Sequence, residues 1–265
     1  MTTTIETQGD SPVRVEHRDG IGILTLADPR RRNVLSALTV EGINAAYDLF
    51  EADDDIRCVV LAADGPAFCA GAELQVLEES AAGQFDDIET VYRGFLRVLE
   101  SPLPTIAVVE GAAVGAGLNL ALACDLRIAG PDAAFDSRFL TLNLLPGGGH
   151  LWLLERLVGK ERATAMALFG EPVDAATAAE IGLVYQACPT GDIARASALT
   201  LAARVAATSP HFVRALTSLV RDEPRLPHHR DALALERWAQ RWSTTHPDFR
   251  SGVARMRAVV ESRSR

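Results

Sequence analysis

The stretch that decides the fold runs from residue 105 to residue 129 and reads TIAVVEGAAVGAGLNLALACDLRIA. Its first part, Thr105 to Val109, is a short and largely β-branched run that predicts a buried strand. A segment of small residues follows, the pattern through Ala123 predicts a helix, and Leu126 to Ala129 predicts another strand. A strand, a turn of small residues and a helix in succession indicate an α/β core.

The same plan extends outward along the chain. A short apolar strand is predicted from Cys58 to Ala62, followed by a glycine-containing turn and a helix. The other expected elements are a β-hairpin over Val13–Leu26, a helix over Leu38–Ala52, and a short strand over Ala133–Phe135. From Gly149 onward the pattern is almost wholly helical, with strand potential only near Val184–Ala187. These patterns predict stacked ββα units in a core of residues 1–200, and a helical C-terminal region of residues 201–265.

The composition excludes several classes of partner. Lys plus Arg total 26 against 35 Asp plus Glu, which gives a net charge of −9 over 265 residues. This balance argues against a nucleic-acid partner, although a few local arginines could still bind a small polyanion. No apolar run approaches the roughly 20 residues that a membrane-spanning helix needs. The N-terminal sequence has no signal-peptide organisation, so we expect a cytoplasmic protein without a membrane partner.

The four cysteines stand singly in the sequence, and we expect them to be buried thiols in a reducing compartment. They are Cys58, Cys69, Cys124 and Cys188. No His/Cys pair has the spacing of metal ligands, so no metal site is expected.

Two strand-to-helix turns consist of small residues, AFCAGAEL at 67–74 and EGAAVGAG at 110–117. Small residues let a ligand approach the backbone, and the free N–H groups of a helix start point toward it. Two such turns facing each other could form an oxyanion hole from backbone donors alone. The alternative is that each turn only permits close packing of the chain.

The motifs AFCAGAEL, EGAAVGAGLNLALACDLRIA and LNLLPGGG together resemble the crotonase (enoyl-CoA hydratase/isomerase) superfamily, from about Val13 to the C-terminus. The resemblance implies a crotonase-type spiral of ββα units with a helical C-terminal trimerisation region. It also implies a homotrimer or a dimer of trimers. The ligand would be an acyl-CoA or enoyl-CoA thioester, with coenzyme A as part of the substrate and no separate cofactor.

The resemblance also assigns roles to individual positions of this chain. The oxyanion-hole donors should be the backbone N–H groups of Ala72 and Ala116. The residues expected beside the coenzyme A moiety are Arg31, Arg32 and Asn33, with backbone contacts from Ala70 to the adenine.

The chain departs from the family at the positions that carry hydration. A hydratase of this family has two glutamates where this sequence has Asn119 and Phe139, and some relatives have an acidic residue at the position of Gly147. Each positioned acid or base typically contributes about 10²–10⁴-fold to a rate. Loss of both carboxylates should therefore remove most hydratase activity. Asn119 and Phe139 are then expected to contact the substrate, with Phe139 favouring an apolar acyl tail.

Two other residues are candidates for a relocated acid or base. His150 follows the PGGG turn and could reach the pocket; alternatively, it is a helix-start histidine that faces solvent or a neighbouring subunit. Asp136 is expected near the acyl chain; alternatively, it caps a helix.

Three functions are compatible with these observations. One is a divergent enoyl-CoA hydratase or isomerase, a lyase or isomerase of fatty-acid or related acyl-CoA metabolism, with non-standard catalytic residues. Another is an inactive acyl-CoA carrier or binding protein that kept the pocket. A third is a structural role in a multienzyme complex.

Overall fold

The computed structural model describes residues 2–5, 11–83, 86–223 and 226–263 of the chain. Two compact units can be distinguished, Met1–Ala207 and Thr208–Arg265. The boundary expected from the sequence, between residues 200 and 201, lies inside a helix that ends at Ala206.

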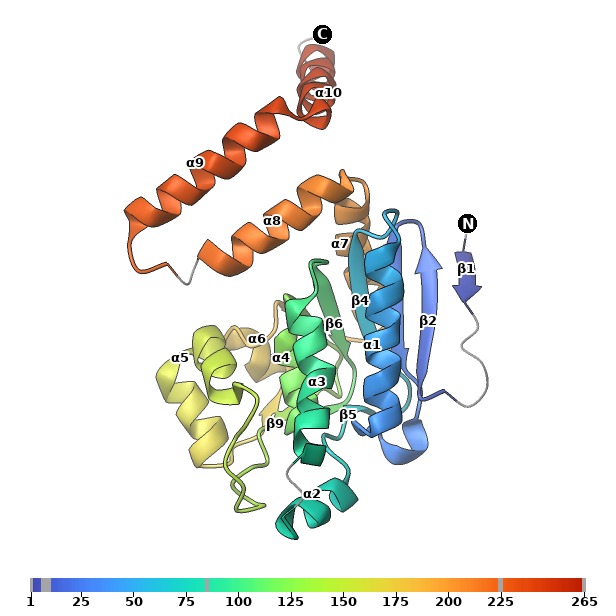
Figure 1. Cartoon of the computed structure of the whole chain (residues 1–265), viewed down its shortest axis with the longest axis vertical. Helices are drawn as coiled ribbons and strands as arrows, with labels where there is room; N and C mark the ends of the chain where they lie inside the picture. Colours follow the sequence, from blue (N-terminus) through green and yellow to red (C-terminus); the bar gives the residue numbers. More distant parts are fainter. Residues whose placement is uncertain (1, 6–10, 84–85, 224–225, 264–265) are drawn as a thin grey trace. The chain divides into compact units, whose positions relative to one another are not determined.

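The first unit contains a seven-stranded mixed sheet, shown in Figure 1. Its strands, in spatial order, are β1 (Thr2–Ile5), β2 (Val13–Arg18), β3 (Ile21–Leu26), β4 (Cys58–Ala63), β6 (Thr105–Val109), β8 (Leu126–Ala129) and β11 (Gln186–Ala187). The strands from β3 to β11 run parallel to one another, whereas β2 pairs antiparallel with both β1 and β3. The predicted hairpin is confirmed as β2–β3. Its two-residue turn, Asp19-Gly20, has positive φ angles of 49° and 82°, which match the twist of a hairpin.

A smaller sheet of four strands completes the core. Its order is β10 (Val173–Asp174), β9 (Ala134–Asp136), β7 (Ala112–Val114) and β5 (Ala67–Cys69). The pairs β4/β5, β6/β7 and β8/β9 each send one strand to the large sheet and the next to the small one. The predicted succession of ββα units is therefore confirmed. The prediction of an almost wholly helical region after Gly149 missed β10, because a two-residue edge strand is too short to show a period of two.

Helices surround the two sheets and form the second unit. Those of the first unit are η1 (Pro29–Arg31), α1 (Ala37–Ala52), α2 (Leu74–Ala81), α3 (Asp86–Glu100), α4 (Ala116–Ala123), α5 (His150–Leu168), α6 (Ala175–Glu180) and α7 (Gly191–Ala206). Those of the second unit are α8 (Pro210–Asp222), α9 (His229–Thr245) and α10 (Pro247–Arg263). Helix α5 is kinked at Gly159, where φ is 76°.

Strand β4 shows why the large sheet is apolar on both faces. Val59 and Leu61 belong to the main core cluster, which includes the buried side chains of α1. The alternate residues, Cys58 and Val60, pack in a second cluster with an alanine stripe on α7. Both faces are covered by helices, so the strand reads as a continuous apolar run rather than an alternating one.

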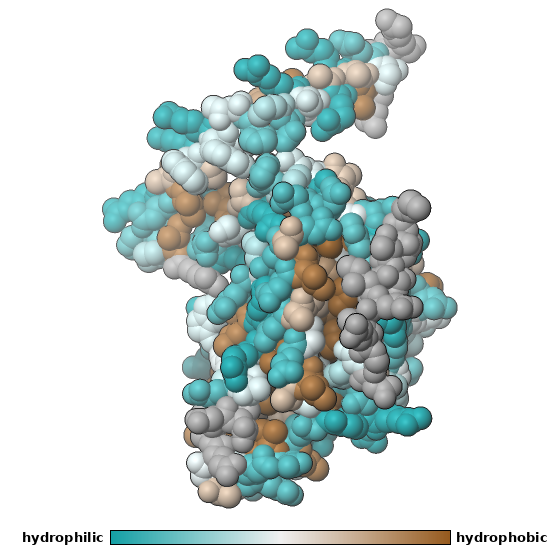
Figure 2. All heavy atoms as spheres, turned by 45° about the vertical axis from the view of Figure 1, so that its right-hand side comes forward, coloured by the Kyte–Doolittle hydropathy of each residue, from teal (hydrophilic) through white to brown (hydrophobic). Residues whose placement is uncertain are grey.

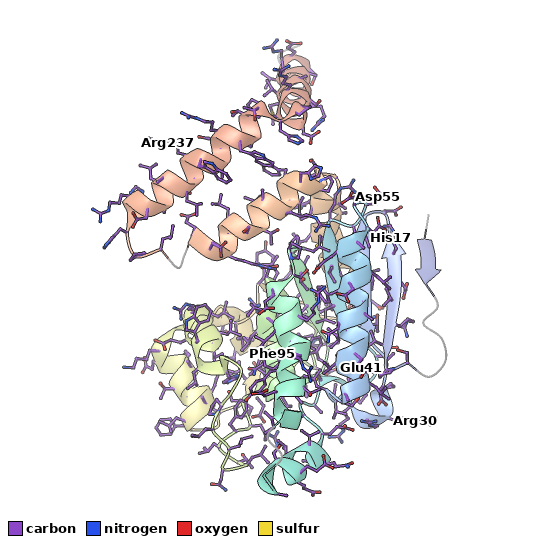
Figure 3. The ribbon with its side chains drawn as sticks, in the orientation of Figure 1. His17, Arg30, Glu41, Asp55, Phe95 and Arg237 are labelled. Atoms are coloured by element: carbon purple, nitrogen blue, oxygen red, sulfur yellow. The ribbon has the colours of Figure 1, made fainter. Side chains whose placement is uncertain are left out.

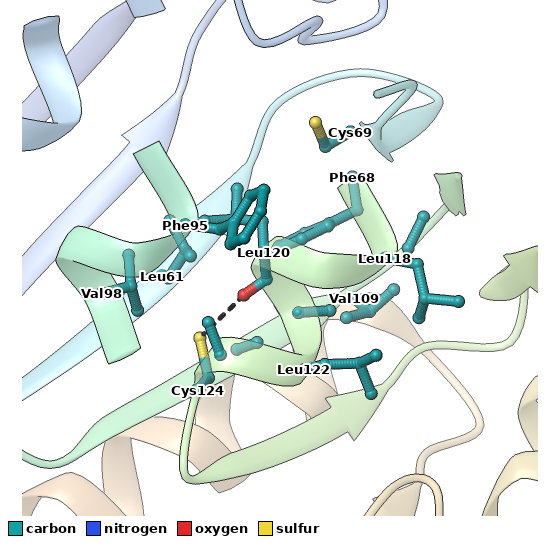
Figure 4. Close-up of a cluster of buried hydrophobic side chains, with 14 of the residues drawn as sticks. Leu61, Phe68, Cys69, Phe95, Val98, Val109, Leu118, Leu120, Leu122 and Cys124 are labelled. Atoms are coloured by element: carbon teal, nitrogen blue, oxygen red, sulfur yellow. Dashed lines mark hydrogen bonds between the residues drawn. The ribbon is translucent and has the colours of Figure 1, made fainter. Parts of the chain in front are cut away.

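Helix α4 lies deep in the main core, and every residue from Gly117 to Ala123 is buried. Figure 4 shows its leucines packed with Phe68 and Phe95, and the Sγ of Cys124 directed at the carbonyl of Leu120, 3.5 Å away. A helix that is apolar on every side apart from one residue, Asn119, is expected in such a position. All four cysteines are buried and free of disulfides, as predicted.

The second unit carries many exposed apolar side chains. Residues such as Leu216 on α8, Trp238 on α9 and Met256 on α10 expose 44%, 70% and 65% of their surface. Hydrophobic side chains stand among hydrophilic ones on the surface drawn in Figure 2. No helix among the described residues is long and apolar enough to span a bilayer.

Candidate active site

The two turns of small residues lie against each other, where β5 and β7 end side by side in the small sheet. A Cβ atom on Gly117 would stand 2.1 Å from the carbonyl oxygen of Cys69. A Cβ atom on Gly71 would stand 2.7 Å from the carbonyl oxygen of Val114, and the φ of Gly71 is 93°. Only glycine fits at these two positions, because the opposing atoms belong to the backbone and cannot move aside.

Each turn presents a backbone N–H group that has no acceptor in the described part of the chain. Neighbouring groups are paired: the N–H of Leu35 donates to the carbonyl of Gly71, and that of Asn119 donates to the carbonyl of Gly115. The N–H groups of Ala72 and Ala116 are not among these bonds. Ala116 is the first residue of α4, where no intrahelical acceptor exists, and Gly115 provides no side-chain cap.

Ala72 and Ala116 line the same cavity, which has a volume of about 790 Å³. Its walls come from the two turns, from α2 and α3, and from the loop between β9 and α5. Most of the lining is apolar, with Leu74, Leu77, Ile88, Val91, Phe139, Leu142, Leu144 and Leu145. Among the lining residues of the described chain, the charged side chains are two arginines, Arg32 and Arg138, and none is a carboxylate. The cavity therefore suits an apolar group attached to an anionic one.

Three buried polar side chains form a hydrogen-bonded chain at the wall of this cavity. The Nδ1 of His150 lies 2.7 Å from the Oδ1 of Asn119, and its Nε2 lies 2.9 Å from the Oγ of Ser137. The Nδ2 of Asn119 donates to the carbonyl of Gly147 at 3.2 Å. Each of the three side chains belongs to a residue that exposes 1% of its surface, and Asn119 and Ser137 line the cavity. The sequence-based alternative for His150, a histidine facing solvent, is therefore wrong for this chain, because the loop before α5 folds the ring inward.

Burial sets the charge state of His150. It lowers the pKa of the imidazole from 6.5 to about 4, so the ring is neutral at pH 7. Phe139 contributes to this apolar environment, since its ring meets the imidazole edge-on with 4.9 Å between centroids. A neutral imidazole has one nitrogen that donates and one that accepts a hydrogen bond.

Asp136, the other candidate acid or base, has a different set of partners. Its Oδ1 accepts a hydrogen bond from the backbone N–H of Arg138 at 2.7 Å, and its Oδ2 accepts one from the guanidinium Nε at 2.9 Å. No helix begins at this residue, so the alternative of a helix cap is wrong: the carboxylate closes a turn instead. Asp136 is not among the residues that line the cavity.

The arginines of the loop between β3 and α1 differ in their partners. Arg31 forms ion pairs with Glu73 and with Asp28. Arg32 lines the cavity with a left-handed backbone, φ 55°, and no ion pair is recorded for it among the described residues. Arg30 is exposed at the tip of the loop (Figure 3). Arg32 is thus the arginine of the loop that is placed to meet a ligand in the cavity.

Asn33 and Ala70 hold this loop in place. The Nδ2 of Asn33 donates to the carbonyls of Asp64 and Ala67, and its Oδ1 accepts from the N–H of Asp28. Both hydrogens of the amide are therefore used within the protein. The N–H of Ala70 donates to the carbonyl of Arg32, and Ala70 also lines the cavity.

Gly147, at the third position where the family resemblance places an acid in some relatives, lies against the side chain of Tyr92. A Cβ atom there would stand 1.9 Å from the hydroxyl oxygen of Tyr92. Tyr92 itself lines the cavity. Neither the contact of Tyr92 with Gly147 nor that of Ser137 with His150 is predictable from the sequence, because neither has a local signature along the chain.

Comparison with known proteins agrees with this architecture. The sequence model of the enoyl-CoA hydratase/isomerase family matches residues 16–263. The chain is 42% identical over 252 residues to the probable enoyl-CoA hydratase EchA14 of Mycobacterium tuberculosis, covering 92% of this chain and 96% of that protein. It is 34% identical over 240 residues to the 1,2-epoxyphenylacetyl-CoA isomerase of Escherichia coli, covering 89% and 91%. The crystal structure of an enoyl-CoA hydratase from Bacillus anthracis superposes with a TM-score of 0.87 at 26% identity, over 93% of this chain and 96% of that one.

Proposed function

This chain belongs to the enoyl-CoA hydratase/isomerase family, with the α/β crotonase fold predicted from its motifs, and on that premise we propose that it binds and activates an acyl-CoA or enoyl-CoA thioester. The thioester oxygen lies between the backbone N–H groups of Ala72 and Ala116. The observation that carries the proposal is that both groups lack an acceptor among the described residues and line one largely apolar cavity. Donors aimed at a developing oxyanion stabilise an enolate or a tetrahedral intermediate without reorganisation.

The proposed reaction cannot follow the hydration mechanism in which two glutamates transfer the protons. Asn119 and Phe139 occupy the two hydratase positions, and neither exchanges a proton at pH 7. The third acidic position is Gly147, which carries no side chain and lies against the hydroxyl of Tyr92. Proton transfer therefore relies on the neutral pair of Ser137 and His150, which is the hydrogen-bonded acid/base pair at the cavity wall.

A second candidate function, an acyl-CoA carrier without catalysis, is favoured by one observation. The cavity is lined by no carboxylate among the described residues. A carrier would retain thioester affinity and would turn over no substrate.

Crotonyl-CoA separates these functions when hydration and binding are measured on the same protein. We expect binding, with hydration at least about 10⁴-fold slower than in a relative that has both glutamates. Hydration at the rate of such a relative would contradict the proposed chemistry. Absence of binding would contradict the proposed site.

The placement of the thioester is tested by Ala72→Pro, which removes one donor. We expect acyl-CoA affinity and any turnover to fall, by up to the roughly 10²–10³-fold in rate that loss of one such donor costs elsewhere. Ala72→Ser keeps the N–H group and a small side chain, and serves as the matched control. Unchanged affinity and turnover in a folded Ala72→Pro protein would show that the thioester binds elsewhere.

We further propose that the second unit assembles the protein into a trimer or a dimer of trimers. The exposed apolar side chains of α8, α9 and α10 support this, because such surface is normally covered by a partner. Sedimentation should give a trimeric or hexameric mass at micromolar concentration, and Trp238→Glu should weaken the assembly. A monomer at that concentration would contradict the proposal.

A further inference from the structure

The hydrogen bonds at the cavity wall have a fixed direction. The Nδ2 of Asn119 donates to the carbonyl of Gly147, so its Oδ1 faces the imidazole and can only accept. The proton of neutral His150 must therefore reside on Nδ1. The unprotonated Nε2 then accepts a hydrogen bond from the hydroxyl of Ser137. Ser137, His150 and Asn119 thus have the hydrogen-bond directions of the nucleophile, the base and the orienting group in serine and cysteine hydrolases.

The hydrogen-bonded side chains of Asn119, His150 and Ser137 lie beside the proposed oxyanion hole. Strands β7 and β9 run parallel with Val114 opposite Asp136, so the residues that follow them, Gly115 and Ser137, leave the sheet at the same edge. The N–H of Gly115 donates to the carbonyl of Asp136 at 2.9 Å. The next N–H group along that turn is the donor of Ala116, so hydroxyl and donor come from neighbouring backbones.

We propose that this chain also hydrolyses saturated acyl-CoA thioesters through an acyl-serine intermediate, with Ser137 as nucleophile and His150 as base. The proposal rests on the thioester site at Ala72 and Ala116 described above. Asn119 is a positioning residue, which holds the imidazole in the tautomer that the base requires. The required geometry is a thioester carbonyl carbon within about 3–3.5 Å of the Ser137 Oγ.

The chemical steps balance with water as the co-reactant. The Ser137 Oγ forms a bond to the thioester carbonyl carbon and gives its proton to the Nε2 of His150. The carbonyl electron pair moves onto oxygen in the hole and returns as the C–S bond breaks, and His150 gives the proton to the departing sulfur of coenzyme A. Water then attacks the serine ester, its proton passes through His150 to the Ser137 Oγ, and a carboxylic acid leaves.

The neutral surroundings of the imidazole favour the first step and limit its rate. Burial keeps His150 unprotonated at pH 7, so its Nε2 can receive the serine proton. The neutral Asn119 orients the ring, but it supplies no negative charge to stabilise the imidazolium that forms. An aspartate at this position would supply that charge.

Octanoyl-CoA tests the proposal, because it has no double bond to hydrate or isomerise. We expect the purified full-length protein to release coenzyme A thiol and to gain the mass of one octanoyl group on Ser137. Ser137→Ala and His150→Gln should each lower the release by at least about 10³-fold. Ser137→Cys keeps a nucleophile of similar size and should accumulate a thioester adduct. Ser101→Ala removes an equally buried hydroxyl away from the cavity and is the matched control.

Asn119→Asp distinguishes a positioning role from a structural one. Its carboxylate should raise the pKa of His150 and increase the release of coenzyme A about tenfold or more. A lower rate in this variant would overturn the role assigned to Asn119.

The outcomes also separate this proposal from the proposed function. Octanoyl-CoA that binds without thiol release, or that is hydrolysed equally fast by Ser137→Ala, overturns the acyl-serine proposal and leaves the thioester site standing. If the wild-type protein binds crotonyl-CoA but not octanoyl-CoA, only the acyl-serine proposal fails; if it binds neither, both proposals fail.

Discussion

The cavity has two halves built on different principles. One half consists of the turns at residues 67–74 and 110–117, where backbone N–H groups and glycines at the closest approaches shape the proposed site. The other half consists of Asn119, Ser137 and His150, where particular side chains meet from three elements. The backbone half depends on shape and has no room for an added atom at Gly71, Gly111 or Gly117. The side-chain half depends on chemical identity and on remaining uncharged.

The largest expected effect comes from breaking the backbone half with Gly117→Ala. The added methyl would overlap the carbonyl oxygen of Cys69, 2.1 Å away. We expect the free energy of unfolding to fall by at least about 3 kcal/mol, the upper end of the usual cost of overpacking. Denaturant unfolding measures the loss. Gly130→Ala, where the nearest atoms stand 3.4 Å away, is the control, and an equal loss there would contradict the close packing of the turns.

The side-chain half should be broken by acid. Folded His150 takes up a proton only near pH 4, whereas the unfolded chain does so near pH 6.5. Between these values the unfolded state binds more protons, so stability is full above pH 6.5 and is lost as the pH falls toward 4. The loss should reach about 3 kcal/mol.

His150→Gln isolates this contribution from the other titrating groups. Unfolding free energies of the variant and the wild type, measured from pH 7 to pH 4, should converge as the pH falls. Parallel curves would show that His150 is protonated equally in both states.

A smaller effect on stability is expected where the two halves meet, at Gly147 and Tyr92. Gly147→Ala should cost about 1–3 kcal/mol of unfolding free energy, because its methyl would overlap the tyrosine hydroxyl. Tyr92→Leu shortens the opposing side chain, so the double variant should recover about 1 kcal/mol relative to the sum of the single changes. Strict additivity would show that the two residues do not compete for the same space.

The smallest effect concerns the arginine loop. Arg32→Ala should weaken coenzyme A binding by a few-fold, a change of about 0.5–1 kcal/mol that shrinks at high salt. Arg31→Ala should have less effect, because Arg31 is already paired with Glu73 and Asp28. Titration calorimetry at two salt concentrations measures both. A larger loss for Arg31→Ala would reverse the assignment.

Much of the fold follows from local patterns in the sequence. The run Thr105–Val109 is β6 without a change of boundary, and the helix expected over Leu38–Ala52 begins one residue earlier. Buried strands of this kind are recognisable because burial on both faces requires a continuous apolar run. The two-residue strand β10 was missed, because it has no periodic signal.

The sequence by itself determined the strands and the two turns of small residues. These features depend on neighbouring residues and on the backbone freedom of glycine, which are local properties. Only the tertiary structure decided that His150 turns inward between Asn119 and Ser137, that Tyr92 lies against Gly147, and that Arg31 is paired with Glu73. These contacts join residues that are between 13 and 55 positions apart in the sequence. The contacts of His150 and Tyr92 depend on how the segment between β9 and α5 folds over α3 and α4, and that of Arg31 depends on how the loop after β3 meets the start of α2; no local pattern encodes either placement.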